Sequence, residues 1–567
     1  MPLINDEFKS KHDNYPQIVL QLLKNRNIES DEEIKLYLHG EFGTDTHDPF
    51  LFNDMEEAVA LIIKHIKAQN KIVVYGDYDA DGVTASAVLV EILEIFKAQV
   101  NVYLPDRVNE GYGLNKEALD GIIKNETKLI ITVDGGIRNK EEVIYAQERG
   151  VDVIITDHHV PPENKADLPP CLIINAQLED EKYPFKYLAG VGAAFKLARA
   201  LISKAKLEDS HKKRLEERSL DLVAIGTVAD MVILRGENRI LVKKGLEILN
   251  NTKRPGLKEL MKASNIVNGK VVSSWNIGFQ LAPRLNAAGR VDHANTAYEL
   301  LAAKDVREAH KLAQGLNENN ADRQDITVDL VEKVKAQINS EDKIIIGLCG
   351  LEDEKWNEGV IGLVAGKIAN KYYRPTLVIT KTQDGYKGSG RGIQEFSIIA
   401  AVEESKEFLE KYGGHPMACG FSLKEKDLEN FLKKIRQIAN DKLKDADLTP
   451  KILIEAELDL EDINEDLMEK LEMFEPFGKD NERPVFCSRG AQVMDIVMMG
   501  FEQQHIKFRL KSENSRVISA LGFGQTKKWQ DCKIGDKIDI AYYLEVNEFN
   551  GKREIQMKIV DINLLSE

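Results

Sequence analysis

The sequence has few cysteines and no long apolar run, and each absence excludes a class of protein. Its 567 residues include five scattered cysteines without a Cys-x-x-Cys pair, so neither a disulfide framework nor a zinc module is expected. No apolar run approaches the roughly 18 residues of a membrane span, and the first residues form neither a basic leader nor an apolar signal core. We therefore expect a cytoplasmic protein without a membrane partner.

Basic residues are the minority charge, with 77 Lys and Arg against 93 Asp and Glu, for a net charge of -16. A uniformly acidic surface would repel a polyanion. One acidic stretch, which we interpret as a solvated face, comprises Glu455, Glu457, Asp459, Glu461, Asp462, Glu465, Asp466 and Glu469. A locally basic region follows, formed by Lys507, Arg509, Lys511, Arg516, Lys527, Lys528, Lys533 and Lys537. The net charge therefore does not exclude a polyanion bound in a local groove.

Three short segments rich in aspartate and histidine each follow an apolar, strand-like run. They are GDYDADG at 76–82, TVDGG at 132–136 and TDHH at 156–159. Open α/β sheets bind ligands beyond the carboxyl ends of their strands. The three segments are therefore predicted to gather at one edge of a parallel sheet, which would bring together the carboxylates of Asp77, Asp79, Asp81, Asp134 and Asp157.

Such a group of carboxylates predicts a metal site. Without counter-charge, several of them would stay protonated at neutral pH. Carboxylates with one or two imidazoles and no thiolate suit Mn²⁺ or Mg²⁺, and two ions about 3.5 to 4 Å apart would act on a phosphoester. Alternatively, the Asp-Gly pairs are turn residues and His158 and His159 ordinary strand-end residues. The recurrence of the pattern after three strands favours a hydrolytic centre for phosphate esters.

The order of the apolar patterns predicts an α/β fold with several units. Strands and amphipathic helices alternate over 56–250, which indicates a parallel sheet covered on both faces. Helical patterns dominate 294–338, as one long connecting helix or two, and a second α/β unit follows. Short strands with turns then predict a small β-barrel, at 452–458, 492–499, 506–510, 517–521, 538–546 and 555–562.

Further motifs extend the pattern along most of the chain: LAGVG at 188–192, GTVAD at 226–230, APRLNAAGR at 282–290, KGSGR at 387–391 and GGH at 413–415. With the three acidic segments, this ordered set resembles the DHH phosphoesterase superfamily and, within it, the bacterial RecJ family. The resemblance implies a parallel-sheet DHH domain, a long helix, a smaller α/β DHHA1 domain and a C-terminal OB-fold barrel. We expect an N-terminal segment at 1–55 and these parts at 56–290, 291–340, 341–448 and 449–567, respectively.

The resemblance also implies roles for the acidic residues. Asp77, Asp79 and Asp134 would hold one divalent cation, Mn²⁺ or Mg²⁺, while Asp81, Asp134, His158 and Asp230 would hold a second. His159 would face the scissile phosphate, and Asp157 would orient an imidazole. The implied catalytic set is Asp79, Asp81, Asp134, His158, His159 and Asp230. The residues alone leave the roles of Asp157, His158 and His159 open, and Asp230 by itself reads as a helix-cap acid.

For the substrate, the resemblance implies single-stranded DNA, hydrolysed from the 5′ end to mononucleotides in repair and recombination. The matching positions for the 5′ phosphate and DNA are Arg107, Arg290, Ser389, Arg391 and His415. On their own, Arg107 fits a surface charge, Arg290 an interdomain salt bridge, and KGSGR a flexible loop between a strand and a helix. The family further implies a monomer, with a single-strand-binding protein and a RecQ-type helicase as possible partners.

Two other functions fit parts of the pattern. A DHH phosphodiesterase of short oligonucleotides or cyclic dinucleotides would keep the metal centre, but the C-terminal strands and the chain length weigh against it. A non-catalytic relative that serves as a replication scaffold would not need the acids. The presence of aspartate at 77, 79, 81, 134 and 230 argues against this scaffold.

Overall fold

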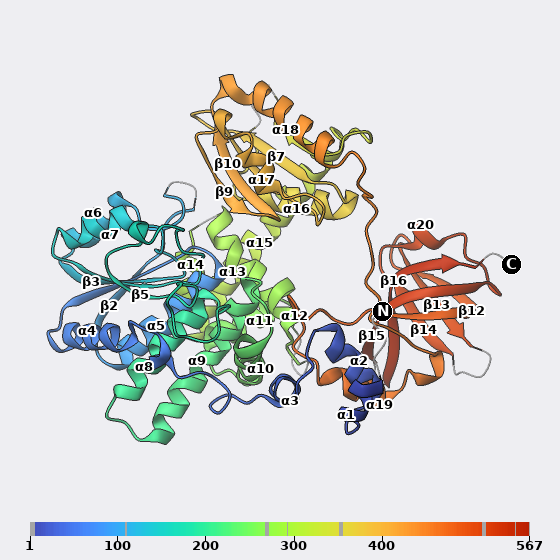
Figure 1. Ribbon diagram of the computed structural model, residues 1–567, viewed down its shortest axis with the longest axis horizontal. Helices are drawn as coiled ribbons and strands as arrows, with labels where there is room; N and C mark the ends of the chain where they lie inside the picture. Colours follow the sequence, from blue (N-terminus) through green and yellow to red (C-terminus); the bar gives the residue numbers. More distant parts are fainter. Residues whose placement is uncertain are drawn as a thin grey trace.

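The computed structural model describes residues 6–107, 110–266, 271–291, 293–350, 355–512, 517–549 and 552–565. It confirms the α/β class, with three units arranged around a central opening (Figure 1). The DHH-like unit lies on one side, the second α/β unit lies above, and the C-terminal strands lie opposite. Among the described residues, every helix is too short or too polar to cross a membrane.

The first sheet has the strand order β2 (Gln99–Tyr103), β1 (Lys71–Gly76), β3 (Thr127–Val133), β4 (Asp152–Thr156) and β5 (Leu172–Ile174). All of its pairings are parallel. Gly76 pairs with Val133, and Val133 pairs with Thr156, so β1, β3 and β4 end at the same level. The residues that follow these three strands consequently emerge side by side, as predicted.

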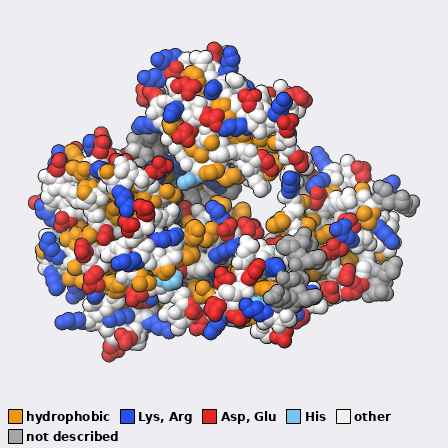
Figure 2. Space-filling view, viewed as in Figure 1, with side chains coloured by type: hydrophobic (Ala, Val, Ile, Leu, Met, Phe, Trp, Pro, Cys, Tyr) orange, Lys and Arg blue, Asp and Glu red, His pale blue; other side chains and the backbone are white. Residues whose placement is uncertain are grey.

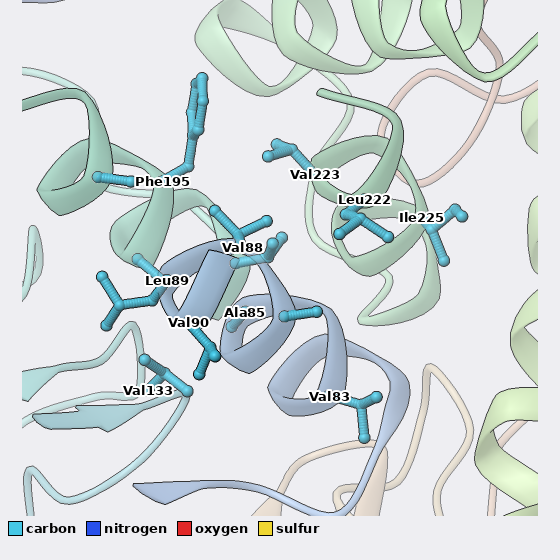
Figure 3. Close-up of a cluster of buried hydrophobic side chains, with 14 of the residues drawn as sticks. Val83, Ala85, Val88, Leu89, Val90, Val133, Phe195, Leu222, Val223 and Ile225 are labelled. Carbon is cyan, nitrogen blue, oxygen red and sulfur yellow. The ribbon is translucent and has the colours of Figure 1, made fainter. Parts of the chain in front are cut away.

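Helix α5 (Ala80–Ile95) is buried almost all round because apolar residues cover its whole circumference. Figure 3 shows it between the sheet and two further helices, α8 (Gly190–Lys204) and α9 (Asp209–Ala229). Helix α4 (Met55–Lys67) packs on the same core, and α6 (Lys116–Lys124) and α7 (Lys140–Gln147) cover the opposite face. The start of α5, which carries three of the acids, is thereby fixed from several directions.

A helical region completes this unit. It consists of α10 (Gly236–Asn250), α11 (Pro255–Ala263), α12 (Ser274–Asn276), a π-helical turn η3 (Ile277–Leu281), α13 (Ala282–Val291) and α14 (Asn295–Ala302). Helix α15 (Val306–Lys335) then leads to the second unit. Its residues Ala309 and Leu316 lie in the first core, and Leu330 and Val334 lie in the second core. The predicted connection is thus made of two helices, of which the longer belongs to both units.

The second sheet has the order β6 (Ile345–Leu348), β7 (Thr376–Lys381), β8 (Tyr386–Arg391), β10 (Ala418–Leu423) and β9 (Lys411–His415). Helices α16 (Ile361–Tyr372), α17 (Ile398–Glu403) and α18 (Leu428–Lys442) accompany it. The KGSGR motif is therefore the central strand β8, not a flexible loop. Its glycines leave room for neighbours, since a Cβ on Gly388 would lie 2.1 Å from the Phe421 ring.

The C-terminal strands follow the predicted series: β11 (Ala456–Glu457), β12 (Phe486–Met499), β13 (His505–Lys511), β14 (Ile518–Gly522), β15 (Lys537–Phe549) and β16 (Lys552–Leu564). Pairings run from β12 through β13, β14, β16 and β15 back to β12. This circuit is the arrangement of a small barrel. Helices α19 (Glu465–Glu472) and α20 (Thr526–Trp529) flank it. Arg516 of the predicted basic region lies outside the described residues.

The N-terminal helices α1 (Asp6–Lys11), α2 (Gln17–Asn25) and α3 (Asp31–His39) share a core with the C-terminal unit. Arg26 pairs with Glu455 at 2.6 Å in a buried site. Arg239 of α10 donates hydrogen bonds to the backbone oxygens of Tyr37 and Phe474. Glu455 is therefore a buried partner of a distant arginine, and its assignment to a solvated face was wrong.

The remaining elements are single turns of 3-10 helix: η1 (Pro49–Leu51), η2 (Lys165–Asp167), η4 (Lys406–Phe408), η5 (Glu425–Asp427) and η6 (Leu460–Asp462).

Candidate metal centre

Backbone hydrogen bonds at the start of α5 position the first acidic segment. Asp79 caps the helix and accepts hydrogen bonds from the amides of Asp81, at 2.8 Å, and Gly82, at 3.2 Å. The Ala80 amide donates to the side chain of Asn286 on α13, at 2.7 Å. Asn286 belongs to the APRLNAAGR motif, so that motif holds the turn that carries the acids.

Asp77, Asp79 and Asp134 form the first group of possible ligands. One oxygen from each lies within 4.8 Å of the others. The Oδ1 atoms of Asp77 and Asp134 are buried and have no hydrogen-bond partner among the described residues. Because a buried carboxylate oxygen without a partner is costly, this group fits a cation.

Asp81, His158 and Asp230 form the second group, again with one atom each within 4.8 Å. His158 Nε2 lies 3.1 Å from Asp134 Oδ1 and 3.6 Å from Asp230 Oδ2. This Nε2 is also buried without a hydrogen-bond partner in the described part of the chain. Asp134 therefore adjoins both groups, the position expected for a bridging carboxylate.

The N-terminus of α8 faces the second group. The amides of Gly190 and Val191 donate to the two oxygens of Asp81, at 2.7 and 2.9 Å. A side chain at position 190 would collide with Asp134, since a Cβ there would lie 2.5 Å from both Cβ and Oδ1 of Asp134. Asp134 itself has a φ of 60°, a conformation that aspartate tolerates better than most residues. The LAGVG motif thus permits the close approach of three elements.

The electrostatics of these acids confirm that they repel one another. Burial and the Asp79 charge raise the pKa of Asp77 well above its ordinary value, and burial and Asp81 do the same to Asp134. Burial, together with neighbouring carboxylates, raises the pKa of Asp81 and of Asp230 to about 7. Burial and His159 lower the pKa of His158, which favours the neutral imidazole that binds metals. Divalent cations would remove this repulsion.

His159 is held by Asp157 behind it. The Asp157 Oδ1 atom lies 2.8 Å from His159 Nδ1 and accepts hydrogen bonds from the amides of His158 and His159. Burial acts to lower the pKa of His159, but the bond to Asp157 outweighs it and the pKa rises to about 9. The hydroxyl of Tyr112 lies 3.0 Å from the same Nδ1. The other ring nitrogen, Nε2, is left for a ligand.

Arginines of the two α/β units lie near one another where the units meet. Ser389 and Arg391 share one face of β8, and their side-chain atoms lie close to the first turn of α16 at Gly362. Arg290 donates to the Gly359 oxygen at 2.6 Å, and Arg107 lies over the Tyr78 ring. Burial and the charges of Arg107 and Arg323 lower the pKa of Arg290 to about 9. These guanidinium groups are near enough to repel one another, as expected of an anion site.

His415 occupies a different place. It lies on the edge strand β9 and is exposed. Its register partner Ala418 also pairs with Arg391, so the three residues form one row across the sheet. The structure therefore places His415 on the row of Arg391 but two strands from it.

Two arginines and a tyrosine near the site were missed from the sequence. Arg323 of α15 has a buried Nε without a hydrogen-bond partner in the described ranges. Burial and the charge of Arg323 lower the pKa of Arg284 on α13. Nothing in the helical pattern around Arg323 marks it. Tyr112 could have been found, because it stands between two glycines in the sequence, a pattern that marks a turn, and both Gly111 and Gly113 have positive φ in the structure.

Family models match three parts of the chain. The DHH family, N-terminal domain, matches residues 71–227, the DHHA1 domain matches 341–441, and the RecJ OB domain matches 454–561.

Curated relatives match nearly the whole chain. The single-stranded-DNA-specific exonuclease RecJ of Bacillus subtilis is 38% identical over 96% of this chain and 67% of its own length. The protein of the same name from Dickeya dadantii is 33% identical over 96% of both chains.

Solved structures of proteins with the same name have a similar fold. RecJ from Thermus thermophilus in complex with Mn²⁺ is 28% identical, with a TM-score of 0.82 over 99% of this chain and 78% of that one. A structure of exonuclease RecJ bound to manganese is 34% identical, with a TM-score of 0.60 over 70% of this chain and 98% of that one.

Proposed function

This chain belongs to the RecJ family of single-stranded-DNA-specific exonucleases, and we propose that it hydrolyses single-stranded DNA from the 5′ end and releases mononucleotides. The observation that carries the proposal is that two groups of possible ligands, one of Asp77, Asp79 and Asp134 and one of Asp81, His158 and Asp230, adjoin each other where His158 Nε2 lies 3.1 Å from Asp134 Oδ1. Arg107, Arg290 and Arg391 lie near these acids, and phosphoesters are the substrates that such a combination suits.

In this proposal Asp77, Asp79 and Asp134 hold one divalent cation, Mn²⁺ or Mg²⁺, and Asp81, Asp134, His158 and Asp230 hold the other. Such a pair would activate a water molecule and spread the negative charge that develops at phosphorus. The chain's own part is to fix these ligands before substrate arrives. The α8 amides lock the Asp81 carboxylate, and the helix cap fixes one oxygen of Asp79 and leaves the other available.

His159 would act on the substrate itself. The carboxylate of Asp157 accepts a hydrogen bond from Nδ1–H and thereby fixes the orientation of the ring. Nε2–H would then donate to a phosphoryl oxygen and stabilise the added charge, and it would do so without reorganisation during the reaction. We therefore assign His159 to the substrate rather than to a cation, although one of its ring nitrogens also lies within 4.8 Å of possible ligand atoms of Asp134 and His158.

Arg107, Arg290, Ser389 and Arg391 would hold the 5′ phosphate. The planar guanidinium of Arg391 provides paired donors, and Ser389 and the first turn of α16 lie beside it. A terminal phosphate anchored there would place the next phosphodiester at the metal centre. Hydrolysis from the 5′ end, one nucleotide at a time, is the direction that the resemblance to the RecJ family implies, and such an anchor would suit it.

Other parts of the proposal rest on the family. We propose a catalytic unit at 56–290, a DHHA1 domain at 341–448 and an OB-fold at 449–567 that grips the strand. His415 would contribute to DNA contact from its edge strand. A monomer, a cytoplasmic role in repair and recombination, and docking of a single-strand-binding protein and a RecQ-type helicase belong to the same proposal. Sedimentation analysis of the purified chain tests the monomer.

A digestion time course with Mn²⁺ tests the proposed reaction. Single- and double-stranded DNA, each labelled at the 5′ or the 3′ end, should behave differently. The 5′ label should appear at once as mononucleotide from single strands, whereas the 3′-labelled strand should shorten gradually and duplex should persist. Preference for a dinucleotide over a long strand would instead support a short-oligonucleotide phosphodiesterase, and the absence of any hydrolysis would support a scaffold.

A further inference from the structure

One face of helix α13 lies against both the metal centre and the second unit. Asn286, Gly289 and Arg290 are spaced three and four residues apart, so they share one side of the helix. Leu285 and Ala288 anchor the rest of the helix in the core of the DHH-like unit. The contacts of this face concern the turn at residues 77–82, which carries three of the acids and is called the acid turn below.

Asn286 orients a peptide of the acid turn. Its Oδ1 atom accepts a hydrogen bond from the Ala80 amide at 2.7 Å. Ala80 is fully buried and opens α5, and the amide of a first helical residue has no partner within its own helix. Asp79 caps the next two amides with its own side chain. Asn286 therefore supplies from outside the partner of the first amide and fixes the peptide that joins Asp79 to Ala80.

Gly289 brings the same face against the backbone between the first two acids. A Cβ on Gly289 would lie 2.7 Å from the Tyr78 carbonyl oxygen, so a larger residue would push α13 and the acid turn apart. The Tyr78 ring in turn supports Arg107, whose guanidinium lies 4.8 Å from the ring centroid. The acid turn is thus held against α13 at two points, Asn286 and Gly289, about one helical turn apart.

Arg290 continues this face to the second unit. It donates to the Gly359 oxygen at 2.6 Å, and a Cβ on Gly359 would lie 2.6 Å from the Arg290 oxygen. Gly359 stands just before α16, and a Cβ on Gly362 in the first turn of α16 would lie 3.0 Å from Ser389 Oγ and 3.1 Å from Arg391. Figure 1 shows α13 where the two units meet, and Figure 2 shows the second unit seated on the DHH-like unit above the central hollow.

We propose that Asn286 is a positioning residue that, through α13, keeps the acid turn aligned with the phosphate residues of the second unit. This inference rests on the proposed function. A strand whose 5′ phosphate is held at Arg391 meets the metal centre at a place that the protein sets, whereas a strand with a 5′ hydroxyl is free to follow the centre. Loss of the Asn286 contact lets the acid turn move, so it harms the anchored strand more.

Mn²⁺ binding tests the hold on the acid turn without turnover. Asn286→Leu keeps a side chain of similar size but leaves the Ala80 amide buried without its partner, whereas Asn286→Asp keeps an oxygen in place. Electron paramagnetic resonance of free Mn²⁺, titrated into the full chain, should show about tenfold weaker binding for the leucine variant, the lower range for a group that orients a ligand. The aspartate variant should bind Mn²⁺ at least nearly as tightly as wild type.

Asn317→Leu is the matched control. Asn317 Oδ1 accepts a hydrogen bond from Arg284 Nε at 3.0 Å, so this variant removes an asparagine contact between α13 and α15 and leaves the acid turn alone. It should keep the Mn²⁺ affinity of wild type. Equal affinity losses in Asn286→Leu and Asn317→Leu would indicate a general loosening of α13 and would overturn the positioning role. Unchanged Mn²⁺ affinity in Asn286→Leu would overturn it as well.

Kinetics at saturating Mn²⁺ test the alignment. On a 5′-phosphorylated strand the kcat of Asn286→Leu should fall by about 100-fold, the loss that a displacement of about 1 Å can cause, while KM stays near that of wild type. On the same strand with a 5′ hydroxyl the loss should be much smaller, and Asn286→Asp should restore the preference for the phosphate. Equal losses on both strands would overturn the alignment, because Asn286 would then act on the metal centre alone.

The outcomes separate this inference from the proposed function. If wild type degrades single strands and Asn286→Leu matches it on both kinds of strand, the alignment is wrong and the function stands. A wild-type protein that degrades no single strand refutes the function, and the alignment with it, even where Mn²⁺ affinity falls as expected. Melting temperatures in EDTA check that every variant folds.

Discussion

At the scale of single residues, the centre is a set of buried acids whose mutual repulsion should destabilise the fold unless cations bind. The metal-free protein holds extra protons on Asp81 and Asp230, since both pKa values are raised to about 7 against about 3.9 in an unfolded chain. Folded protein thus binds more protons than unfolded protein between about pH 4 and 7. Stability should fall as the pH rises through this window, by a few kcal/mol, the order that such shifts imply.

Asp134→Asn tests this at the shared ligand. An amide is uncharged and tolerates the positive φ, so the variant in EDTA should melt at a higher temperature than wild type at pH 7.5, with a smaller difference at pH 5. Its hydrolysis of single strands should fall by more than about 100-fold, the upper range for a residue that only supports a ligand. Calorimetry and a nuclease assay check the two effects. Near-native turnover would refute the assignment of Asp134.

Arg391→Ala tests the phosphate pocket. Loss of a charge-assisted contact, about 1.5 to 3 kcal/mol, should lower kcat/KM on 5′-phosphorylated strands by roughly 10- to 100-fold. Strands with a 5′ hydroxyl should be much less affected, and Arg391→Lys should fall between because an ammonium lacks the planar fork. Competition between the two strands measures the preference directly. Equal losses on both kinds of strand would count against the pocket.

At the scale of elements, the sequence was informative where the fold repeats a simple rule. Three apolar runs followed by acids predicted the metal site, because parallel strands end at one edge and β1, β3 and β4 do so in register. No such rule identified the structure of the KGSGR motif. Its glycines suggest a loop, but they belong to β8 because the Phe421 ring needs the space above Gly388. The local sequence does not show which distant side chain packs against a glycine.

The first turn of α8 offers a test with its own control. Gly190→Ala would push a methyl group into Asp134 and disturb the amide that holds Asp81, and a displacement of about 1 Å in such a site can cost about 100-fold in rate. Gly192→Ala, one half-turn on, would contact only the Leu188 side chain, at 3.3 Å or more. It should keep near-native activity. Comparable kcat values for the two variants would show that α8 does not position the centre.

At the scale of the whole molecule, the N-terminal helices pack against the C-terminal unit. Helices α1–α3 and the C-terminal strands share one core, and Arg26 also pairs with Glu455, which is 429 positions away. Sequence patterns cannot reveal such pairing, because an isolated arginine or glutamate in the sequence looks like an exposed surface residue. For the same reason the acidic stretch was misread at Glu455, and Arg323 was not recognised as a neighbour of Arg290.

Arg26→Met should weaken this joint. It leaves the Glu455 carboxylate buried without its cation, at a cost of about 3 to 5 kcal/mol, and Arg26→Met/Glu455→Met should recover most of the loss. Calorimetry should show the unfolding transition of the C-terminal core moving to lower temperature in the single variant. Dinucleotide hydrolysis should not change, since the metal centre lies in another core. An unchanged transition would show that the pair does not stabilise the joint.

The account depends on two cations sharing one carboxylate, and anomalous diffraction from crystals soaked in Mn²⁺ tests this most directly. Two peaks are expected, one among Asp77, Asp79 and Asp134 and one among Asp81, Asp134, His158 and Asp230. A single peak, or none, with the Asp134 side chain turned away from both groups, would contradict it.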